Sequence, residues 1–272
     1  MSAGRLDARL TRLRESGRKA LVTFVTAGDP APSATVPALH ALVRGGADLL
    51  ELGVPFSDPE AEGPAIQASS ERGLAQGMTL RGCLELVRAF RADDSDTPLV
   101  LMGYLNPVLA MGVEGFARAA GEAGVDGLIM VNLPPEESAV LAAALDRQGI
   151  RLIFLVAPTT TEVRARLILE HASGFVYYVS LKGITGADHL DAQAVGEKLR
   201  WLRALTSLPV MVGFGIKDPQ AAQAVGRLAD GVVVGSALVR AMAAHAETPE
   251  EIPATLEARS RELRTALDEI GG

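Results

Sequence analysis

The sequence predicts an α/β fold, a (β/α)8 TIM barrel with an extra N-terminal helix. Eight short runs rich in Val, Ile and Leu recur along the chain, and segments with helical patterns alternate with them. The runs are almost continuously hydrophobic, as expected of parallel strands that are buried on both faces. Because a chain of 272 residues matches the usual length of one closed barrel, we expect residues 1–272 to form a single domain.

The elements follow one another in a regular order. A helix is expected at about residues 3–17, where it could cap the bottom of the barrel. The strands are expected at residues 20–26, 48–54, 98–104, 127–133, 151–157, 175–180, 209–215 and 231–237. Helical patterns lie at residues 32–47, 112–125, 134–150, 161–174 and 218–229, the last two of which open on residues typical of helix starts. A doubly wound open sheet is the alternative, but no Gly-x-Gly-x-x-Gly motif follows the first strand.

Composition argues against several classes of function. The chain has 26 basic and 33 acidic residues, and its net charge of −7 disfavours nucleic acid or an anionic membrane surface as a partner. A single cysteine, Cys83, excludes an intrachain disulfide and a thiolate zinc cluster. The charged N-terminal segment does not resemble a signal peptide, and no apolar run approaches the ~20 residues of a membrane span. We therefore expect a soluble, cytoplasmic protein.

Glycine-rich turns after the last three strands predict a phosphate site. The segments "KGITGA", "GFGI" and "VGSAL" stand at these strand ends. Glycine lets the backbone approach an anion closely, and the loops after the last strands of such barrels are the usual phosphate-binding position. The candidates are Gly186, Gly215, Gly235 and Ser236. The alternative is that these glycines serve only the tight turns between strand and helix.

Glu51 stands inside the second predicted strand, where an ionised carboxylate is costly to bury. If its side chain faces the mouth of the barrel, apolar surroundings raise its pKa and make it a general acid. The loop that follows adds Asp58, Glu60 and Glu62 between prolines that restrict its conformation. The alternatives are a Glu51 that pairs with a basic residue of a covering helix and loop carboxylates that are simply solvated, the interpretation that we adopt for Glu60.

The segment "LELGVPFSDPEAEGPAIQ", residues 50–67, resembles the signature of the tryptophan synthase alpha subunit family. The resemblance extends through "FVTAGDP", "YLNPV", "LPPEES", "YYVSLKGITGA", "GFGI" and "VGSAL" over essentially the whole chain. It implies retro-aldol cleavage of indole-3-glycerol phosphate to indole and glyceraldehyde 3-phosphate in tryptophan biosynthesis, with no cofactor or metal in this chain. It also implies a pyridoxal-phosphate beta subunit as partner in an αββα heterotetramer, contacted through the loops around residues 55–58, 106–107 and 134–135.

The resemblance assigns roles to individual residues. Glu51 matches the general acid–base that protonates indole C3, and Glu62 matches the second catalytic carboxylate, which accepts the indole N–H. Tyr177 matches an active-site tyrosine, and Thr185 matches a loop threonine that orders the closed site. Apolar walls for the indole are expected at Phe24, Met102, Ile129 and Phe214, and phosphate contacts at Gly186, Gly215, Gly235 and Ser236.

The sequence departs from the family pattern at three positions. Glu62 and Asn132 stand where aspartate is usual or frequent, and Glu60 replaces an apolar residue. The longer Glu62 is expected to displace its carboxylate by ~1 Å, and the Glu60 charge to raise the pKa of both groups. Asn132 is expected to weaken a loop contact. We therefore expect the family's reaction at a reduced rate.

Two other functions stay open at this point. One is an impaired alpha subunit that mainly binds and activates a beta subunit. The other is a different phosphate-binding barrel enzyme, which should place a catalytic Lys or His at a strand end. The histidines of this chain, His40, His171, His189 and His245, lie in predicted helices or loops.

Overall fold

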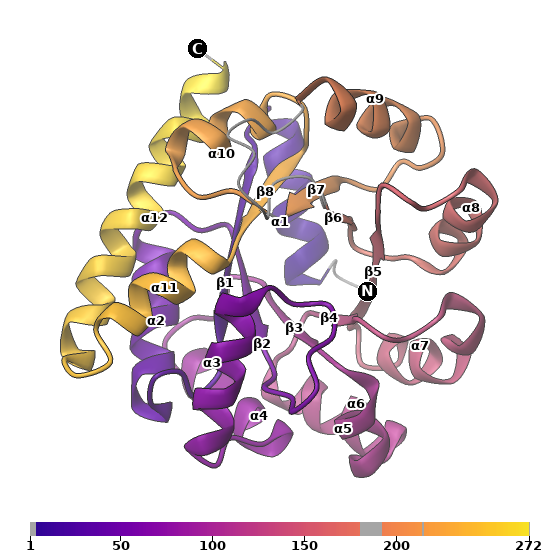
Figure 1. Ribbon diagram of the computed structural model, residues 1–272. Coiled ribbons are helices and arrows are strands. Elements are labelled where there is room, and N and C mark those ends of the chain that lie inside the picture. Colours follow the sequence, from indigo (N-terminus) through magenta and orange to yellow (C-terminus); the bar gives the residue numbers. More distant parts are fainter. Residues whose placement is uncertain (1–3, 180–191, 214, 272) are drawn as a thin grey trace.

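The eight strands form a closed parallel barrel in chain order, as Figure 1 shows. The computed structural model describes residues 4–179, 192–213 and 215–271. Each strand pairs with the next along the chain, and β8 pairs with β1. The TIM barrel prediction is therefore confirmed, and the open doubly wound sheet is excluded.

Every strand lies within its predicted range but ends earlier in most cases. The strands are β1 Ala20–Thr26, β2 Leu49–Gly53, β3 Leu99–Gly103, β4 Gly127–Met130, β5 Arg151–Val156, β6 Val176–Val179, β7 Val210–Gly213 and β8 Gly231–Val234. Some of the residues that follow the strands, among them Val131, Gly215 and Gly235, line a pocket, described below. Ser236 and Ala237, expected at the end of the last strand, begin a helix instead.

Helices surround the barrel in Figure 1. They are α1 Arg5–Glu15, α2 Pro32–Arg44, α3 Pro64–Ala75, α4 Leu80–Arg91, α5 Leu105–Met111, α6 Val113–Ala123, α7 Ala139–Asp146, α8 Glu162–His171, α9 Ala192–Arg203, α10 Pro219–Gly226, α11 Ser236–Ala244 and α12 Ile252–Asp268. Short 3-10 turns cover Pro135–Glu137, Pro249–Glu251 and Glu269–Gly271. The predicted helix starts are confirmed, because the side chains of Thr161 and Asp218 accept hydrogen bonds from the backbone N–H groups of Arg164 and Ala221. None of the described helices is long and apolar enough to cross a membrane.

Alternate residues of each strand face opposite sides of the barrel wall. In β2, Leu50 and Leu52 pack in the core between the strands and the helices, whereas Leu49 belongs to the core inside the barrel. Because side chains alternate along a strand, Glu51 lies on the same inward face as Leu49, one layer closer to the mouth. The period of the strand thus decides where this carboxyl group points.

Helix α1 closes the bottom of the barrel, as the sequence predicts. Leu6, Leu10 and Leu13 are buried in the same cluster as the inward side chains of the strands. Arg5 adds an ion pair to Asp126, with 2.8 Å between Nε and Oδ1. In Figure 1 the helix crosses behind the ring of strands, on the side away from the mouth.

The C-terminal helix α12 packs along α2 and α10 in the outer layer (Figure 1). The last helix of the chain thus contacts the first helix of the outer layer. Arg264 of α12 reaches the barrel bottom, where it donates to Asp48 Oδ2 at 2.8 Å. Cys83 is fully buried in α4, and burial raises the pKa of its thiol to about 12. The thiol is therefore a packing group and not a reactive one.

Candidate active site

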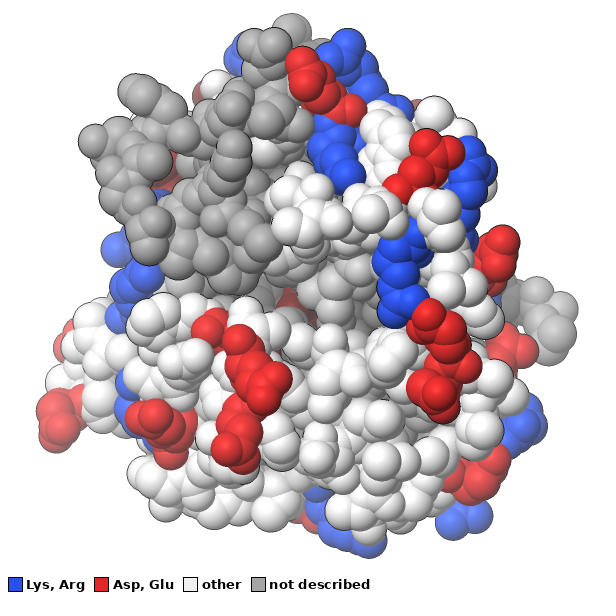
Figure 2. Space-filling model, turned by 45° about the vertical axis from the view of Figure 1, so that its right-hand side comes forward, with Lys and Arg blue, Asp and Glu red and all other residues white. Residues whose placement is uncertain are grey.

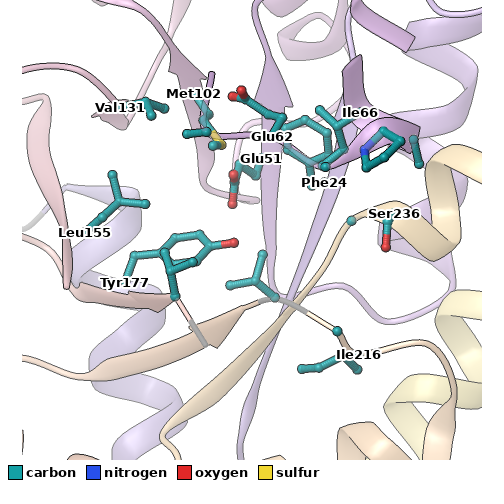
Figure 3. Close-up of a pocket in the computed structure, with 18 of the residues that line it drawn as sticks. Phe24, Glu51, Glu62, Ile66, Met102, Val131, Leu155, Tyr177, Ile216 and Ser236 are labelled. Atoms are coloured by element: carbon teal, nitrogen blue, oxygen red, sulfur yellow. The ribbon is translucent and has the colours of Figure 1, made fainter. Parts of the chain in front are cut away.

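A pocket opens at the carboxyl ends of the strands, where barrels of this kind carry their chemistry (Figure 3). The space between its walls is about 1020 Å³, including the open mouth. Its apolar lining is Phe24, Ile66, Met102, Val131, Leu155, Val179, Ile216 and Val233. Apolar walls with a few polar groups are typical of a site for a small organic molecule.

Glu51 is the most deeply buried carboxyl group of this pocket. Its side chain is 1% exposed, and neither carboxyl oxygen has a hydrogen-bond partner among the described residues. Burial, with a smaller contribution from the charge of Glu62, raises the pKa of Glu51 to about 8. Most Glu51 side chains are therefore protonated at neutral pH, and pairing with a covering helix is excluded.

Glu62 lies in the loop after β2 and is held by a residue that the sequence analysis did not single out. The Tyr104 hydroxyl donates a short hydrogen bond to Glu62 Oε2 and accepts one from the Ala61 N–H at 3.0 Å. The Tyr104 ring is stacked on Phe56, with 4.8 Å between the ring centroids. Tyr104 follows β3 directly, in the quoted segment "YLNPV", so its position at a strand end was the available signal.

Burial raises the pKa of Glu62 above its ordinary value, and hydrogen bonds to Tyr104 and to the backbone oppose part of this rise. The expected contribution of Glu60, an exposed side chain, is wrong, because its charge is not among the causes of the rise. Burial and the bond to Glu62 also raise the pKa of Tyr104 well above its usual range. The hydroxyl therefore stays protonated and acts as the donor.

The acidic loop is anchored from α3. Gln67 Nε2 donates to the carbonyl oxygens of Glu62 and Pro59, at 2.8 and 3.3 Å. The hydroxyls of Thr26 and Ser69 are 2.6 Å apart and join the same helix to β1. The loop is thus fixed by contacts as well as by its prolines, which suits a segment that presents a carboxylate.

Tyr177 comes from β6, and its hydroxyl points into the pocket toward Glu51 in Figure 3. Burial and the Glu51 charge raise the pKa of this phenol well above its usual range. A Cβ at Gly213 of the adjacent strand would lie 2.3 Å from the Tyr177 hydroxyl oxygen. Glycine is therefore required at position 213 to leave room for the ring.

The glycine turns form another side of the pocket. Gly215, with φ of +81°, Gly235 and Ser236 all line it, and α11 begins at Ser236 without a side-chain cap. N–H groups at a helix start carry partial positive charge and suit an anion. Thr185, Gly186 and Phe214 lie outside the described residues.

The predicted apolar walls are only partly brought together. Phe24 and Met102 line the pocket, but Ile129 does not. Ile129 is fully buried in the inner core, in the same cluster as Val22 and Met211. Val131, two residues further along the chain, lines the pocket in its place. The expectation for Ile129 chose the correct face of the strand but a layer too deep.

Two basic residues in the lining, Lys217 and Arg240, were also missed. Lys217 follows the turn "GFGI", and Arg240 lies in α11 after "VGSAL", so both stand next to motifs that the sequence analysis quoted. Their charges lie on the side of the pocket where the phosphate was expected.

Asn132 connects the turn after β4 to the start of α5. Its Oδ1 accepts from the Leu105 N–H at 2.8 Å, and its Nδ2 donates to Asn106 Oδ1 at 3.2 Å. An amide therefore makes a contact at both of its ends here.

The described histidines lie away from the pocket. His40 packs against the Phe90 ring at 4.7 Å between centroids, His171 ends α8, and His245 follows α11. His189 lies outside the described residues. Within the described part of the chain, no group of three or more His, Cys, Asp or Glu side chains is arranged to hold a metal ion.

The fold and the pocket define a class: a (β/α)8 barrel whose mouth holds a buried carboxyl group near glycine turns suited to an anion. The family model described as tryptophan synthase alpha chain matches residues 10–268. The tryptophan synthase alpha chain of Thioalkalivibrio sulfidiphilus is 55% identical over 97% of this chain and 99% of that relative. The tryptophan synthase alpha chain of Laribacter hongkongensis is also 55% identical, over 97% of this chain and 99% of that relative.

Solved structures agree with these relatives. The crystal structure of tryptophan synthase subunit alpha from Legionella pneumophila str. Paris has a TM-score of 0.92 and 42% identity, covering 98% of this chain and all of the other. This chain belongs to the tryptophan synthase alpha chain family.

Proposed function

We propose that this chain cleaves indole-3-glycerol phosphate to indole and glyceraldehyde 3-phosphate. The observation that carries the proposal is Glu51, a buried and unpartnered carboxyl group in an apolar pocket that also holds glycine turns suited to an anion. Membership of the family indicates the reaction. The pKa of about 8 means that the Glu51 carboxyl group is protonated at neutral pH and can act as an acid.

The chemistry needs one proton donor that later accepts a proton. Protonated Glu51 donates to indole C3, which leaves a positive charge on the ring. The bond between C3 and the hydroxyl-bearing carbon of the side chain then breaks, and its electron pair returns to the ring as indole. The hydroxyl proton passes to the Glu51 carboxylate, so that this carbon becomes the aldehyde and the acid is restored.

Glu62 supplies the second charge. Its carboxylate accepts the indole N–H and stabilises the positive ring, which is an electrostatic role made stronger by the exclusion of water. Tyr177 contacts the reacting part of the substrate beside Glu51, and Phe24 and Met102 pack on the indole. Gly215, Gly235 and Ser236 bind the phosphate. The roles of Thr185, Gly186 and Phe214 stay predictions.

The family implies a beta-subunit partner. We propose that the partner carries pyridoxal phosphate, that this chain needs no cofactor or metal of its own, and that the assembly is an αββα heterotetramer. Ser57 and Pro134 are exposed on loops, and Asn106 is exposed in the first turn of α5. Leu109, also of α5, is 58% exposed despite being apolar. These residues support docking at the mouth. The single domain of residues 1–272 and the cytoplasmic location likewise stay proposals.

Indole release from indole-3-glycerol phosphate, with and without a beta subunit, tests the proposal. Glu51→Gln should lose on the order of a thousandfold in kcat, because an amide cannot donate the proton. Glu62→Gln should lose about a hundredfold, because the ring charge is no longer stabilised. Glu60→Gln is the matched control from the same loop. It removes the same charge from an exposed side chain, and it should retain native activity.

The variant Glu62→Asp tests the departure from the family pattern, and its activity should equal or exceed that of the native chain. Native turnover in Glu51→Gln would refute the acid–base assignment. A native chain that releases no indole but activates the beta subunit would instead support the alternative function, an impaired subunit that acts as a binding partner.

A further inference from the structure

Charge is unevenly distributed around the pocket. The described acidic side chains of its lining are Glu51 and Glu62, and the described basic ones are Lys217 and Arg240. Lys217 follows Gly215 in the turn after β7, and Arg240 lies in α11, which begins at Ser236. In Figure 3, Ser236 and Ile216 lie together on one side of the pocket, with Leu155 and Val131 on the other. The cations therefore belong to the side of the glycine turns.

The direction of the Arg240 side chain follows from helix geometry. Residues four apart lie on the same face of a helix, and side chains lean toward the helix N-terminus. Arg240 therefore leans over the first turn of α11, where Ser236 and the uncapped N–H groups lie. Lys217 is two residues beyond Gly215, the glycine with φ of +81°. The two basic groups thus border the same anion-binding turns from different elements.

Neither cation has a partner among the residues that the structure describes. Lys217 and Arg240 are exposed, and neither makes a hydrogen bond or ion pair to another described residue. Arg72 is different, because it pairs with Asp29 at 2.6 Å. On the face shown in Figure 2, basic side chains of the described residues are interspersed with acidic ones and do not gather in one large patch. Two cations without a described partner on one side of a pocket are therefore a local feature.

We propose that Lys217 and Arg240 bind the phosphate group of the substrate and determine the preference for a phosphorylated tail. This inference rests on the proposed function. Backbone N–H groups carry only partial charges, whereas a phosphate monoester carries about −1.5 to −2 at pH 7. The pocket also holds Glu62, and the chain has a net charge of −7, so an anion enters against an unfavourable background. Arg240 offers a planar fork of donors, and Lys217 a compact charge.

Steady-state kinetics separates recognition of the phosphate from chemistry. Lys217→Gln, Arg240→Gln and the double variant are assayed with indole-3-glycerol phosphate and with indole-3-glycerol, which lacks the phosphate. Each single variant should raise KM for the phosphorylated substrate about fivefold, and the double variant about twentyfold, with kcat within about twofold. For the unphosphorylated substrate, the variants should match the native chain. Arg240→Lys should keep most of the binding.

The matched controls are Arg227→Gln and Arg259→Gln. Both remove one positive charge from an exposed side chain outside the pocket lining, and both should leave KM unchanged. A rise in KM for these controls equal to that for the pocket variants would mean that net charge alone acts, which would overturn the proposal.

Calorimetric binding of glycerol 3-phosphate gives a readout that needs no turnover. Its Kd should rise by the same factors in the variants, and the salt dependence of Kd should be shallower in the double variant. Equal Kd values for the native and double-variant proteins would refute the role of the cations, even if the native chain cleaves its substrate. A native chain that binds glycerol 3-phosphate through these residues but releases no indole would refute the proposed function and leave the cation assignment supported.

Discussion

Glu51 carries its proton because its neighbours are apolar, and this arrangement has a consequence for stability. Its ordinary pKa of 4.5 applies when the chain is unfolded, whereas burial raises the pKa to about 8 in the fold. Between these values the folded state binds more protons than the unfolded state. The free energy of unfolding therefore falls as pH rises from about 4.5 to about 8, and the contribution is fully present only below that window.

We predict that Glu51→Gln is more stable than the native chain at high pH, because glutamine mimics the protonated carboxyl group without the cost of ionisation. The gain in the free energy of unfolding should be on the order of 4 kcal/mol at pH 8 and below about 1 kcal/mol at pH 5. Urea denaturation of both proteins at the two pH values measures it. Glu60→Gln, at an exposed site, should show no such pH-dependent gain. A gap that is equal at the two pH values would contradict the assignment.

At the scale of the element, an aromatic side chain of one strand at the mouth packs against a glycine of the adjacent strand. Tyr177 of β6 occupies the space that a side chain at position 213 of β7 would need. Phe24 of β1 does the same beside Gly53 of β2, where a Cβ would lie 2.6 Å from Phe24 Cζ. The glycines at these strand ends thus decide which aromatic rings can reach the pocket.

Gly213→Ala should therefore displace Tyr177, lower kcat by at least about tenfold and destabilise the fold by about 1–3 kcal/mol, as overpacking of a core does. Indole release and thermal unfolding measure the two effects. The matched control is Gly196→Ala in α9, where the nearest heavy atom to a new Cβ is 3.6 Å away. This helical change should be neutral or stabilising. Native activity in Gly213→Ala would show that the ring position is unimportant.

The sequence was most informative about strands and about the chemistry of single positions. Strands buried on both faces produce apolar runs, so all their locations were predictable, and an acid within such a run identified Glu51. Ile129 was misplaced because it shares an inward face with Val131, and depth within the barrel has no sequence signal of its own. Tyr104 was missed because its partner Glu62 is 42 residues away, and the pairing of β2 with β3 brings them together.

For the whole molecule, α1 makes the two ends of the barrel unlike. Its leucines join the inner core, which also contains Tyr177 of the pocket. Packing is therefore continuous from the capped bottom to the mouth. If residues 1–272 form one cooperative unit, a defect at the bottom must be felt throughout the fold.

Leu6→Ala tests this unity, because Leu6 is 1% exposed in the inner core. The cavity should cost about 2–4 kcal/mol of the free energy of unfolding. The single tryptophan, Trp201, lies in α9, so its fluorescence reports on a distant element, while far-ultraviolet circular dichroism reports on the whole chain. Both midpoints should fall together. Arg14→Ala on the exposed side of α1 should shift neither, and a fluorescence midpoint that stays at the native value would show separate units.

Because α1 closes the base of the barrel, the cavity opens at one end. The substrate and both products of its cleavage therefore pass through the same opening, and the residues around that opening govern the order of product release. A partner protein that receives the indole directly has to bind over this opening, because α1 covers the opposite end.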